Sequence, residues 1–150
     1  VLEFLNIPEI HSEKELEQNI IDNLQKFLLE LGKGFTFVAR QFRMTLGNKH
    51  YYVDLVFYHR ILKCFVLIDL KIGEVTHSDI GQMNMYLNYF KKEEMNNDNE
   101  PIGIILTKEK DKILVEYALG GLSNTLFVSK YQLYLPKKEE LKRLLENGKL

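Results

Sequence analysis

The stretch YYVDLVFYHRILKCFVLIDLK, residues 51–71, contains two runs rich in β-branched and aromatic residues, each carrying one aspartate. Asp54 lies in the first run, Asp69 lies in the second, and the polar break 59–63 separates them. This pattern predicts two antiparallel strands joined by a hairpin. A two- or four-residue loop centred on residues 61 and 62 would place Asp54 directly opposite Asp69, and Tyr52 opposite Lys71.

Two facing carboxylates destabilise a strand pair, and a carboxylate on an apolar strand costs more when it lacks a partner. Asp69 and Lys71 are two residues apart and therefore share one face of their strand. A divalent cation would turn the two aspartates into a binding site, because Mg²⁺ prefers oxygen ligands and keeps several waters. The Leu70 carbonyl lies between the two side chains and is a further candidate ligand. The alternative is a structural cluster in which Lys71 pairs with the aspartates, since Asp-x-Lys is a common tripeptide.

The composition is that of an ordinary globular domain, with 45% hydrophobic and 27% charged residues in 150. We expect a single domain over 1–150, and because the chain starts at Val1 we expect it to be a piece of a longer protein. No apolar run is long enough to span a bilayer. The lone cysteine, Cys64, is expected in the core and favours a reducing cytoplasm. The net charge of −1 is not typical of a nucleic-acid-binding protein, although basic residues cluster locally.

The order of predicted elements is helix, three strands, helix, strand, helix, strand, helix. This order indicates a mixed sheet with helices packed against it, an α/β fold. The expected ranges are a helix over 12–31, strands over 35–46, 51–58 and 64–70, a helix over 77–94, a strand over 102–107, a short helix over 110–119, strands over 125–129 and 132–135, and a final helix from 136.

Glu17 lies at the border of the apolar stripe of the first helix, so its side chain could reach the sheet that the helix covers. Most glutamates at such an edge are simply solvated. Gln82 and Tyr86 are four residues apart on the second helix and share a face, so both could point at the same site. An amide and a phenol at the edge of a packed helix are the alternative for this pair.

The residues around these positions resemble the PD-(D/E)xK nucleases, the restriction-endonuclease-like superfamily. The resemblance rests on Val53-Asp54, on Asp69-Leu70-Lys71-Ile72-Gly73 and on Gly81-Gln82-Met83-Asn84-Met85-Tyr86. It extends over essentially the whole chain and is closest to the C-terminal nuclease domain of YhcG-type bacterial proteins. It implies a mixed sheet flanked by helices, with an αβββαβ core and C-terminal additions.

The resemblance also implies a role for each of these residues. Asp54, Asp69, the Leu70 carbonyl and Glu17 would bind Mg²⁺, with Mn²⁺ as the alternative ion. Lys71 would be the catalytic lysine, and Gln82, with Tyr86, would orient the substrate at the catalytic site. Substrate contacts are expected from the following residues: Gln82, Tyr86, Arg43, His59 and Arg60. His59 and Arg60 are expected at the hairpin tip, where they could touch phosphates.

The expected function is metal-dependent hydrolysis of DNA phosphodiester bonds by a cytoplasmic endo- or exodeoxyribonuclease. DNA is therefore the expected partner, together with an N-terminal domain that YhcG-type proteins carry and with a second copy in a homodimer. The competing hypothesis is a non-catalytic module that keeps the nuclease fold and binds DNA or protein. The near-neutral charge keeps this second hypothesis open.

Overall fold

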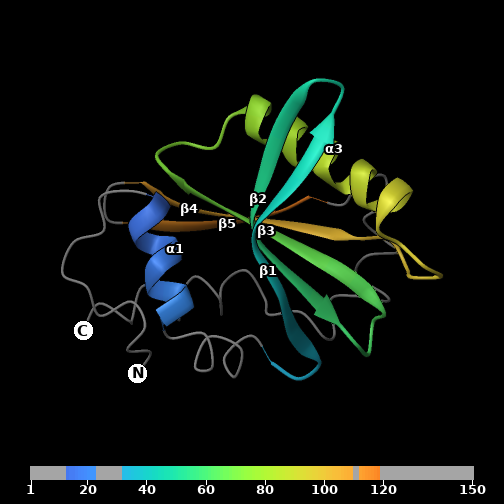
Figure 1. Cartoon of the computed structure of the whole chain (residues 1–150). Helices are drawn as coiled ribbons and strands as arrows, with labels where there is room; N and C mark the ends of the chain where they lie inside the picture. Colours follow the sequence, from blue (N-terminus) through green and yellow to red (C-terminus); the bar gives the residue numbers. More distant parts are fainter. Residues whose placement is uncertain (1–12, 23–31, 110–111, 119–150) are drawn as a thin grey trace.

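The computed structural model describes residues 13–22, 32–109 and 112–118 (Figure 1). Its elements follow in this order: α1 (Glu13–Asp22), β1 (Phe35–Leu46), β2 (Lys49–His59), β3 (Cys64–Ile72), α3 (His77–Glu93), β4 (Ile102–Glu109) and β5 (Lys112–Ala118). The predicted helix over 12–31 is confirmed for α1, and its remaining residues lie outside the described part. No helix among the described residues has the length and apolarity that crossing a membrane requires.

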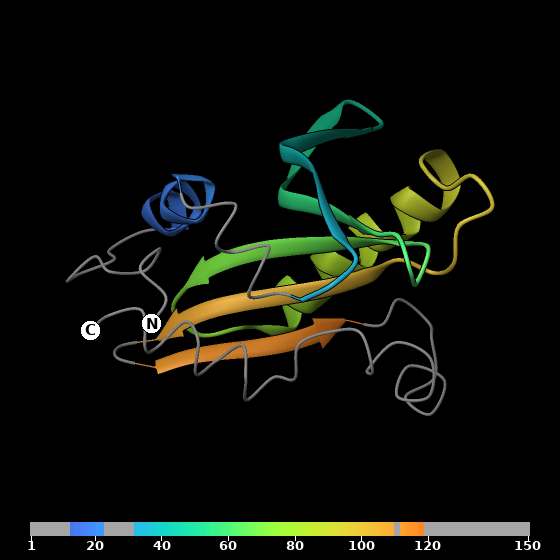
Figure 2. The same ribbon diagram turned by 90° about the horizontal axis from the view of Figure 1, so that it is seen from below.

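The five strands form one sheet in the order β1-β2-β3-β4-β5. Strands β3 and β4 are parallel, whereas the other neighbouring pairs are antiparallel, so the sheet is mixed as predicted. Helix α3 provides the crossover between the parallel strands and packs on the sheet through Met83, Leu87 and Phe90. The far end of the β1–β2 hairpin bends away from the other three strands in both views (Figure 1, Figure 2).

The hairpin that decides the fold has the predicted geometry. His59 pairs with Cys64 and Leu55 with Ile68, which leaves a four-residue turn over 60–63. Cys64 is fully buried, as expected for a small core residue. His59 was expected at an exposed hairpin tip, and this prediction is wrong. It is the last residue of β2, is fully buried, and accepts the backbone N–H of Leu62 on Nδ1 at 3.1 Å.

The predicted helix over 110–119 is also wrong, because residues 112–118 form strand β5. This strand pairs antiparallel with β4, from Glu109–Lys112 to Gly103–Ala118. The sequence KILVEYA contains charged residues that favour a helix, but Ile113, Val115 and Tyr117 favour a strand. Without β5, β4 would present an unpaired edge of buried, apolar residues, so the ladder outweighs the local preference. The predicted elements after residue 119 lie outside the described residues.

Candidate active site

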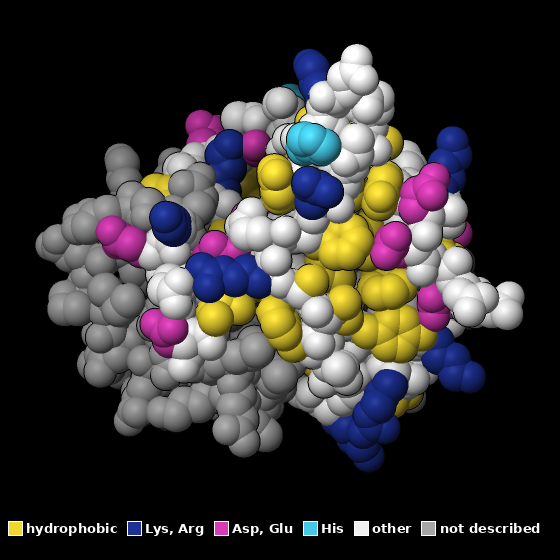
Figure 3. Space-filling model, viewed as in Figure 1, with side chains coloured by type: hydrophobic (Ala, Val, Ile, Leu, Met, Phe, Trp, Pro, Cys, Tyr) yellow, Lys and Arg dark blue, Asp and Glu magenta, His cyan; other side chains and the backbone are white. Residues whose placement is uncertain are grey.

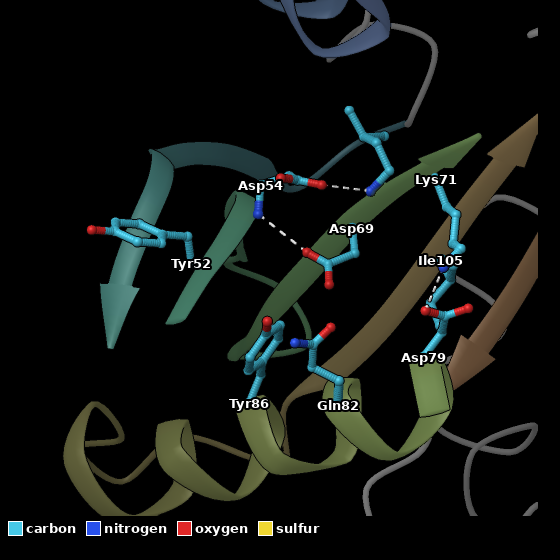
Figure 4. A pocket seen from close by; sticks show the side chains of 9 residues that line it. Tyr52, Asp54, Asp69, Lys71, Asp79, Gln82, Tyr86 and Ile105 are labelled. Atoms are coloured by element: carbon cyan, nitrogen blue, oxygen red, sulfur yellow. Dashed lines mark hydrogen bonds and ion pairs between the residues drawn. The ribbon is translucent and has the colours of Figure 1, made fainter. Parts of the chain in front are cut away.

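The site lies where β2 and β3 separate. Leu55–Ile68 is the last pair of the ladder, and one further step of the same register places Asp54 beside Asp69. The backbone N–H of Asp54 donates to Asp69 Oδ1 at 3.2 Å, and the backbone N–H of Leu70 donates to Asp54 Oδ2 at 2.7 Å (Figure 4). The two carboxylates therefore accept backbone N–H groups at the point where the strands part. Their predicted juxtaposition agrees with these contacts.

Because the Asp54 and Asp69 carboxylates lie close together, their charges favour the binding of a proton or a metal cation between them. Burial and, to a smaller extent, the negative charge of Asp54 raise the pKa of the Asp69 carboxyl to about 7, although the hydrogen bond from the Asp54 backbone opposes the shift. A carboxyl with this pKa is partly protonated at neutral pH, because two close carboxylates in a poorly solvated place cannot both be ionised cheaply. A bound divalent cation would relieve the same repulsion.

Lys71 lies on the β3 face of Asp69, but its ammonium pairs with an acidic residue that the sequence analysis did not select. Its Nζ donates to Asp79 Oδ1 at 2.7 Å. Asp79 belongs to the first turn of α3, where Oδ2 accepts the backbone N–H of Thr76 at 2.7 Å. Burial alone would raise the pKa of Asp79, but the hydrogen bonds from Lys71 and Thr76 outweigh it and lower this pKa. The capping box of α3 and the lysine of the site are therefore joined through one carboxylate.

Glu17 is turned inward, as the sequence analysis allowed, with 5% of the residue exposed. Its Oε1 accepts a hydrogen bond from Gln41 Nε2 at 2.7 Å and lies 3.5 Å from Arg40 Nε. The same Gln41 nitrogen donates to Asp54 Oδ1 at 2.9 Å. Gln41 was missed, although a two-residue turn at Gly47-Asn48 between the two strands would place Gln41 opposite Asp54, as the observed register does.

A cavity of about 210 Å³ lies where β2 and β3 separate (Figure 4). Its lining consists of Tyr52, Asp54, Asp69, Leu70, Lys71, Asp79, Gln82, Tyr86 and Ile105. Gln82 and Tyr86 therefore come together with the aspartates, as their spacing on one helix face suggested. Burial raises the pKa of the Tyr86 hydroxyl, and the charges of Asp69 and Asp54 raise it further. Tyr86 is thus a neutral hydrogen-bonding group in this cavity.

Of the three basic residues predicted to contact the substrate, one lies near the cavity and two lie far from it. Arg43 pairs with Tyr52 on the β1–β2 hairpin and is exposed on the part of the hairpin next to the cavity. Arg60 is exposed, but it lies six residues beyond Asp54 along the chain, about 20 Å away for an extended strand. His59 is buried at that same end. Figure 3 shows a histidine and basic side chains over the β1–β2 hairpin, where Lys49 and His50 are exposed.

The oxygen ligands of the site are of the kind that a hard divalent metal ion prefers. Among the described residues, no group of three or more His, Cys, Asp or Glu side chains is arranged as a metal site. Asp54 and Asp69 nevertheless supply hard oxygen ligands on neighbouring strands, joined by the bond from the Asp54 backbone N–H to Asp69 Oδ1, and burial together with the charge of Asp54 raises the Asp69 pKa. One or two carboxylates with several waters suffice for Mg²⁺. The Asp54–Asp69 pair therefore fits a hard cation, with Glu17 held nearby by Gln41.

A mixed sheet with paired aspartates and a lysine at the end of its central strands defines a PD-(D/E)xK-type nuclease domain. The family model described as the YhcG PDDEXK nuclease domain matches residues 1–146, and the chain belongs to this family. It is 45% identical over 142 residues to a protein named "Putative nuclease YhcG" from Escherichia coli (strain K12). That alignment covers 94% of the chain but only 38% of the relative.

Among solved structures, the chain is similar to the crystal structure of SSO0001. The two share 16% sequence identity with a TM-score of 0.39, over 90% of this chain and 56% of the other. The assignment to the family rests on the sequence comparisons and not on this structural likeness.

Proposed function

We propose that this domain is a metal-dependent nuclease that hydrolyses DNA phosphodiester bonds, as an endo- or exodeoxyribonuclease. The observation that carries the proposal is the Asp54–Asp69 pair, which lies in one cavity with Lys71, Gln82 and Tyr86. Membership of a nuclease family supports the reaction class. The DNA substrate and the choice of Mg²⁺, with Mn²⁺ as the alternative, are parts of the proposal.

In this mechanism Asp54, Asp69 and the Leu70 carbonyl would hold the metal ion, with Glu17 assisting directly or through water. A bound ion would supply Lewis-acid activation of the phosphate and would lower the pKa of the attacking water. Lys71 carries three N–H donors, so the bond to Asp79 leaves two for the attacking water and a phosphate oxygen. Gln82 and Tyr86 orient the substrate from α3. Water attacks phosphorus and releases a proton to solvent, the bond from phosphorus to the leaving oxygen breaks, and that oxygen takes up a proton from solvent.

The substrate strand is proposed to follow the β1–β2 hairpin away from the cavity. Arg43 and Tyr52 are directly paired on that hairpin, and both are exposed. Arg43 would bind phosphate, and Tyr52 lines the cavity next to Asp54. His59 is left out of this role because it is buried, and the position of Arg60 at the opposite end of β2 makes it a weaker candidate.

Further partners are proposed from the length of the relative. The chain spans 38% of that protein, so substrate choice and affinity are assigned in part to a domain outside these residues. A homodimer would bring two such sites to one duplex. A cytoplasmic location is proposed from the lone thiol, Cys64, which is buried and free.

The test is cleavage of end-labelled single-stranded, double-stranded and branched DNA by the purified full-length protein in Mg²⁺, Mn²⁺ or EDTA. We expect metal-dependent cleavage by the parent and loss of at least two orders of magnitude in Lys71→Ala and Asp69→Asn. Lys63→Ala is the matched control, because Lys63 is an exposed lysine in the turn at the other end of β3. Equal cleavage by Lys71→Ala and the parent would remove Lys71 from the mechanism.

The second candidate is a non-catalytic module that binds DNA or protein. The net charge of −1 favours the protein-binding form of this module, because a domain that binds nucleic acid by itself is usually basic. Metal titration separates the two functions. A parent protein that neither cleaves DNA nor gains thermal stability with Mg²⁺ or Mn²⁺, yet retains DNA or a protein partner, would favour the module.

A further inference from the structure

Gln41 has an unusual backbone and a defined place in the sheet. Its φ angle is 50°, in the left-handed region that a non-glycine residue adopts at a cost. The pairs Arg40–Leu55 and Phe42–Val53 flank it, so Gln41 is opposite Asp54. A register shift between Phe37 and Ala39 precedes it on the same strand. Such strain persists where contacts of the side chain hold the residue in place.

The contacts of Gln41 are to two acidic residues from different elements. Nε2 donates to Glu17 Oε1 at 2.7 Å and to Asp54 Oδ1 at 2.9 Å. The amide must present nitrogen here, because ionised carboxylates are acceptors only and would repel the amide oxygen. The Gln41 amide therefore joins Glu17 of α1 to Asp54 of β2. Helix α1 begins more than 20 residues before Gln41 in the chain.

Glu17 needs such a partner because it is buried. Only 5% of the residue is exposed, and a buried carboxylate costs a great deal of free energy unless it is hydrogen-bonded or paired. The Arg40 guanidinium lies farther from the same oxygen, with Nε at 3.5 Å. Arg40 also donates to Gln18 Oε1 at 2.8 Å, a second bridge between α1 and β1 that is exposed to solvent. Gln41 itself is exposed, but its bond to the buried Glu17 is partly shielded from solvent, so this bond is expected to be stronger than the exposed one.

We propose that Gln41 is a positioning residue that docks helix α1 on the sheet and holds Glu17 beside Asp54. Glu17 then contributes to metal binding only while Gln41 keeps it there. The proposal has two halves. The docking half, that Gln41 holds α1 on the sheet, concerns the metal-free fold and stands by itself. The metal half, that Gln41 positions Glu17 for metal binding, rests on the proposed function. In this role Gln41 acts through its two hydrogen bonds and takes no part in proton transfer.

The docking half is tested by hydrogen exchange of the α1 amides in EDTA. Gln41→Met keeps the volume but removes the donor, and Gln41→Asn tolerates the left-handed backbone but is one methylene shorter. Gln18→Met is the matched control, since it breaks the exposed bridge to Arg40 and the Gln18–Asp22 bond within α1 but leaves both hydrogen bonds of Gln41 intact. We expect α1 amides to exchange roughly tenfold faster in both Gln41 variants and within about twofold of the parent in the control. Parent-like exchange of α1 in both Gln41 variants would overturn the proposal.

The metal half is tested by Mn²⁺ titration calorimetry on four proteins: the parent, Glu17→Gln, Gln41→Met and the double variant. In the parent background, Glu17→Gln should weaken Mn²⁺ binding about tenfold, and in the Gln41→Met background less than about twofold. The same weakening in both backgrounds would overturn this half. A parent that binds no Mn²⁺ would defeat the proposed function instead, while the exchange experiment still decides whether Gln41 docks the helix.

Discussion

Asp69 accepts the backbone N–H of Asp54 at 3.2 Å while the charge of Asp54 disfavours its ionisation. The hydrogen bond fixes the two residues together, but burial and repulsion still raise the pKa of Asp69 from 3.8 to about 7. The fold therefore keeps two acidic groups in contact at a cost to its own stability. Sites that bind cations commonly have this property, because the ligand removes the cost.

The first prediction concerns the stability of the metal-free protein against pH. The folded pKa of Asp69 lies above its unfolded value, so the folded state binds more protons between pH 4 and 7. Stability should therefore fall as the pH rises through this window and level off above it. Between about pH 5 and 8, the ionisation of Asp69 should lower the free energy of unfolding by about 2 to 3 kcal/mol. Urea unfolding in EDTA measures it, and Asp69→Asn should lose this part of the slope. If Asp69→Asn showed the same dependence of unfolding free energy on pH as the parent, the raised pKa of Asp69 would be contradicted.

The second prediction compares the two aspartates. Asp69→Asn keeps an oxygen for the Asp54 N–H and removes the repulsion, so it should raise metal-free stability at about pH 8 by about 1–3 kcal/mol. Asp54→Asn should gain less, because its two oxygens accept from Leu70 N–H and Gln41 Nε2, and its new NH₂ would face one of these donors. Thermal unfolding in EDTA measures both changes.

Each of these two variants should also lose the stabilisation that Mg²⁺ or Mn²⁺ gives to the parent. Scanning calorimetry with and without the ion measures this loss. A metal-induced rise in Tm that survives in both variants would place the ion elsewhere and contradict the role of the pair.

The third prediction concerns the Lys71–Asp79 pair. Asp79→Ala removes the partner of Lys71 and one half of the α3 capping box, so it should lower stability by about 1–2 kcal/mol and reduce DNA cleavage. Asp79→Asn can still accept the Thr76 N–H and should recover most of the stability. Chemical unfolding and single-turnover cleavage measure the two effects separately.

Thr76→Val is the matched control for Asp79. It removes the Thr76 hydroxyl, which donates to Asp79 Oδ2 at 3.0 Å, but leaves the Lys71–Asp79 ion pair. It should therefore lower Tm without changing the cleavage rate well below Tm. If Thr76→Val slowed cleavage as much as Asp79→Ala does, Asp79 would act through the helix cap alone.

The sequence was sufficient for the centre of the fold because local and global preferences agree there. The alternation and the short break over 59–63 specify one hairpin register, which sets Asp54 beside Asp69. The spacing of Gln82 and Tyr86 likewise assigns them to one face of α3 and to the same cavity.

The predictions from sequence were wrong or incomplete where contacts between residues far apart in the chain determine the structure. Residues 112–118 form a strand because β4 offers them a ladder, which local propensity does not include. His59 is polar and follows a strand run, yet it lies beneath Gly34 with an edge-on contact to Phe35 at 4.7 Å between ring centroids. The partner of Lys71 could not be inferred from strand register, because Asp79 comes from the helix cap.

The fourth prediction follows from the burial of His59. A Cβ added at Gly34 would lie 2.5 Å from His59 Cε1, and the Gly34 φ angle is +105°. Gly34→Ala should therefore destabilise the protein by about 3 kcal/mol, from strain and from a clash with a buried ring. Gly32→Ala is the matched control, because Gly32 has a φ of +111° but open space around its Cβ position. It should cost about 1 kcal/mol, the backbone strain alone.

Urea unfolding of the two glycine variants at one pH measures the difference. His59→Ala in the Gly34→Ala background should recover part of the loss, because it removes the atoms that clash. Equal destabilisation by Gly34→Ala and Gly32→Ala would mean that the His59 ring is not packed against Gly34. Such a result would agree with the exposed position that the sequence analysis had expected for His59.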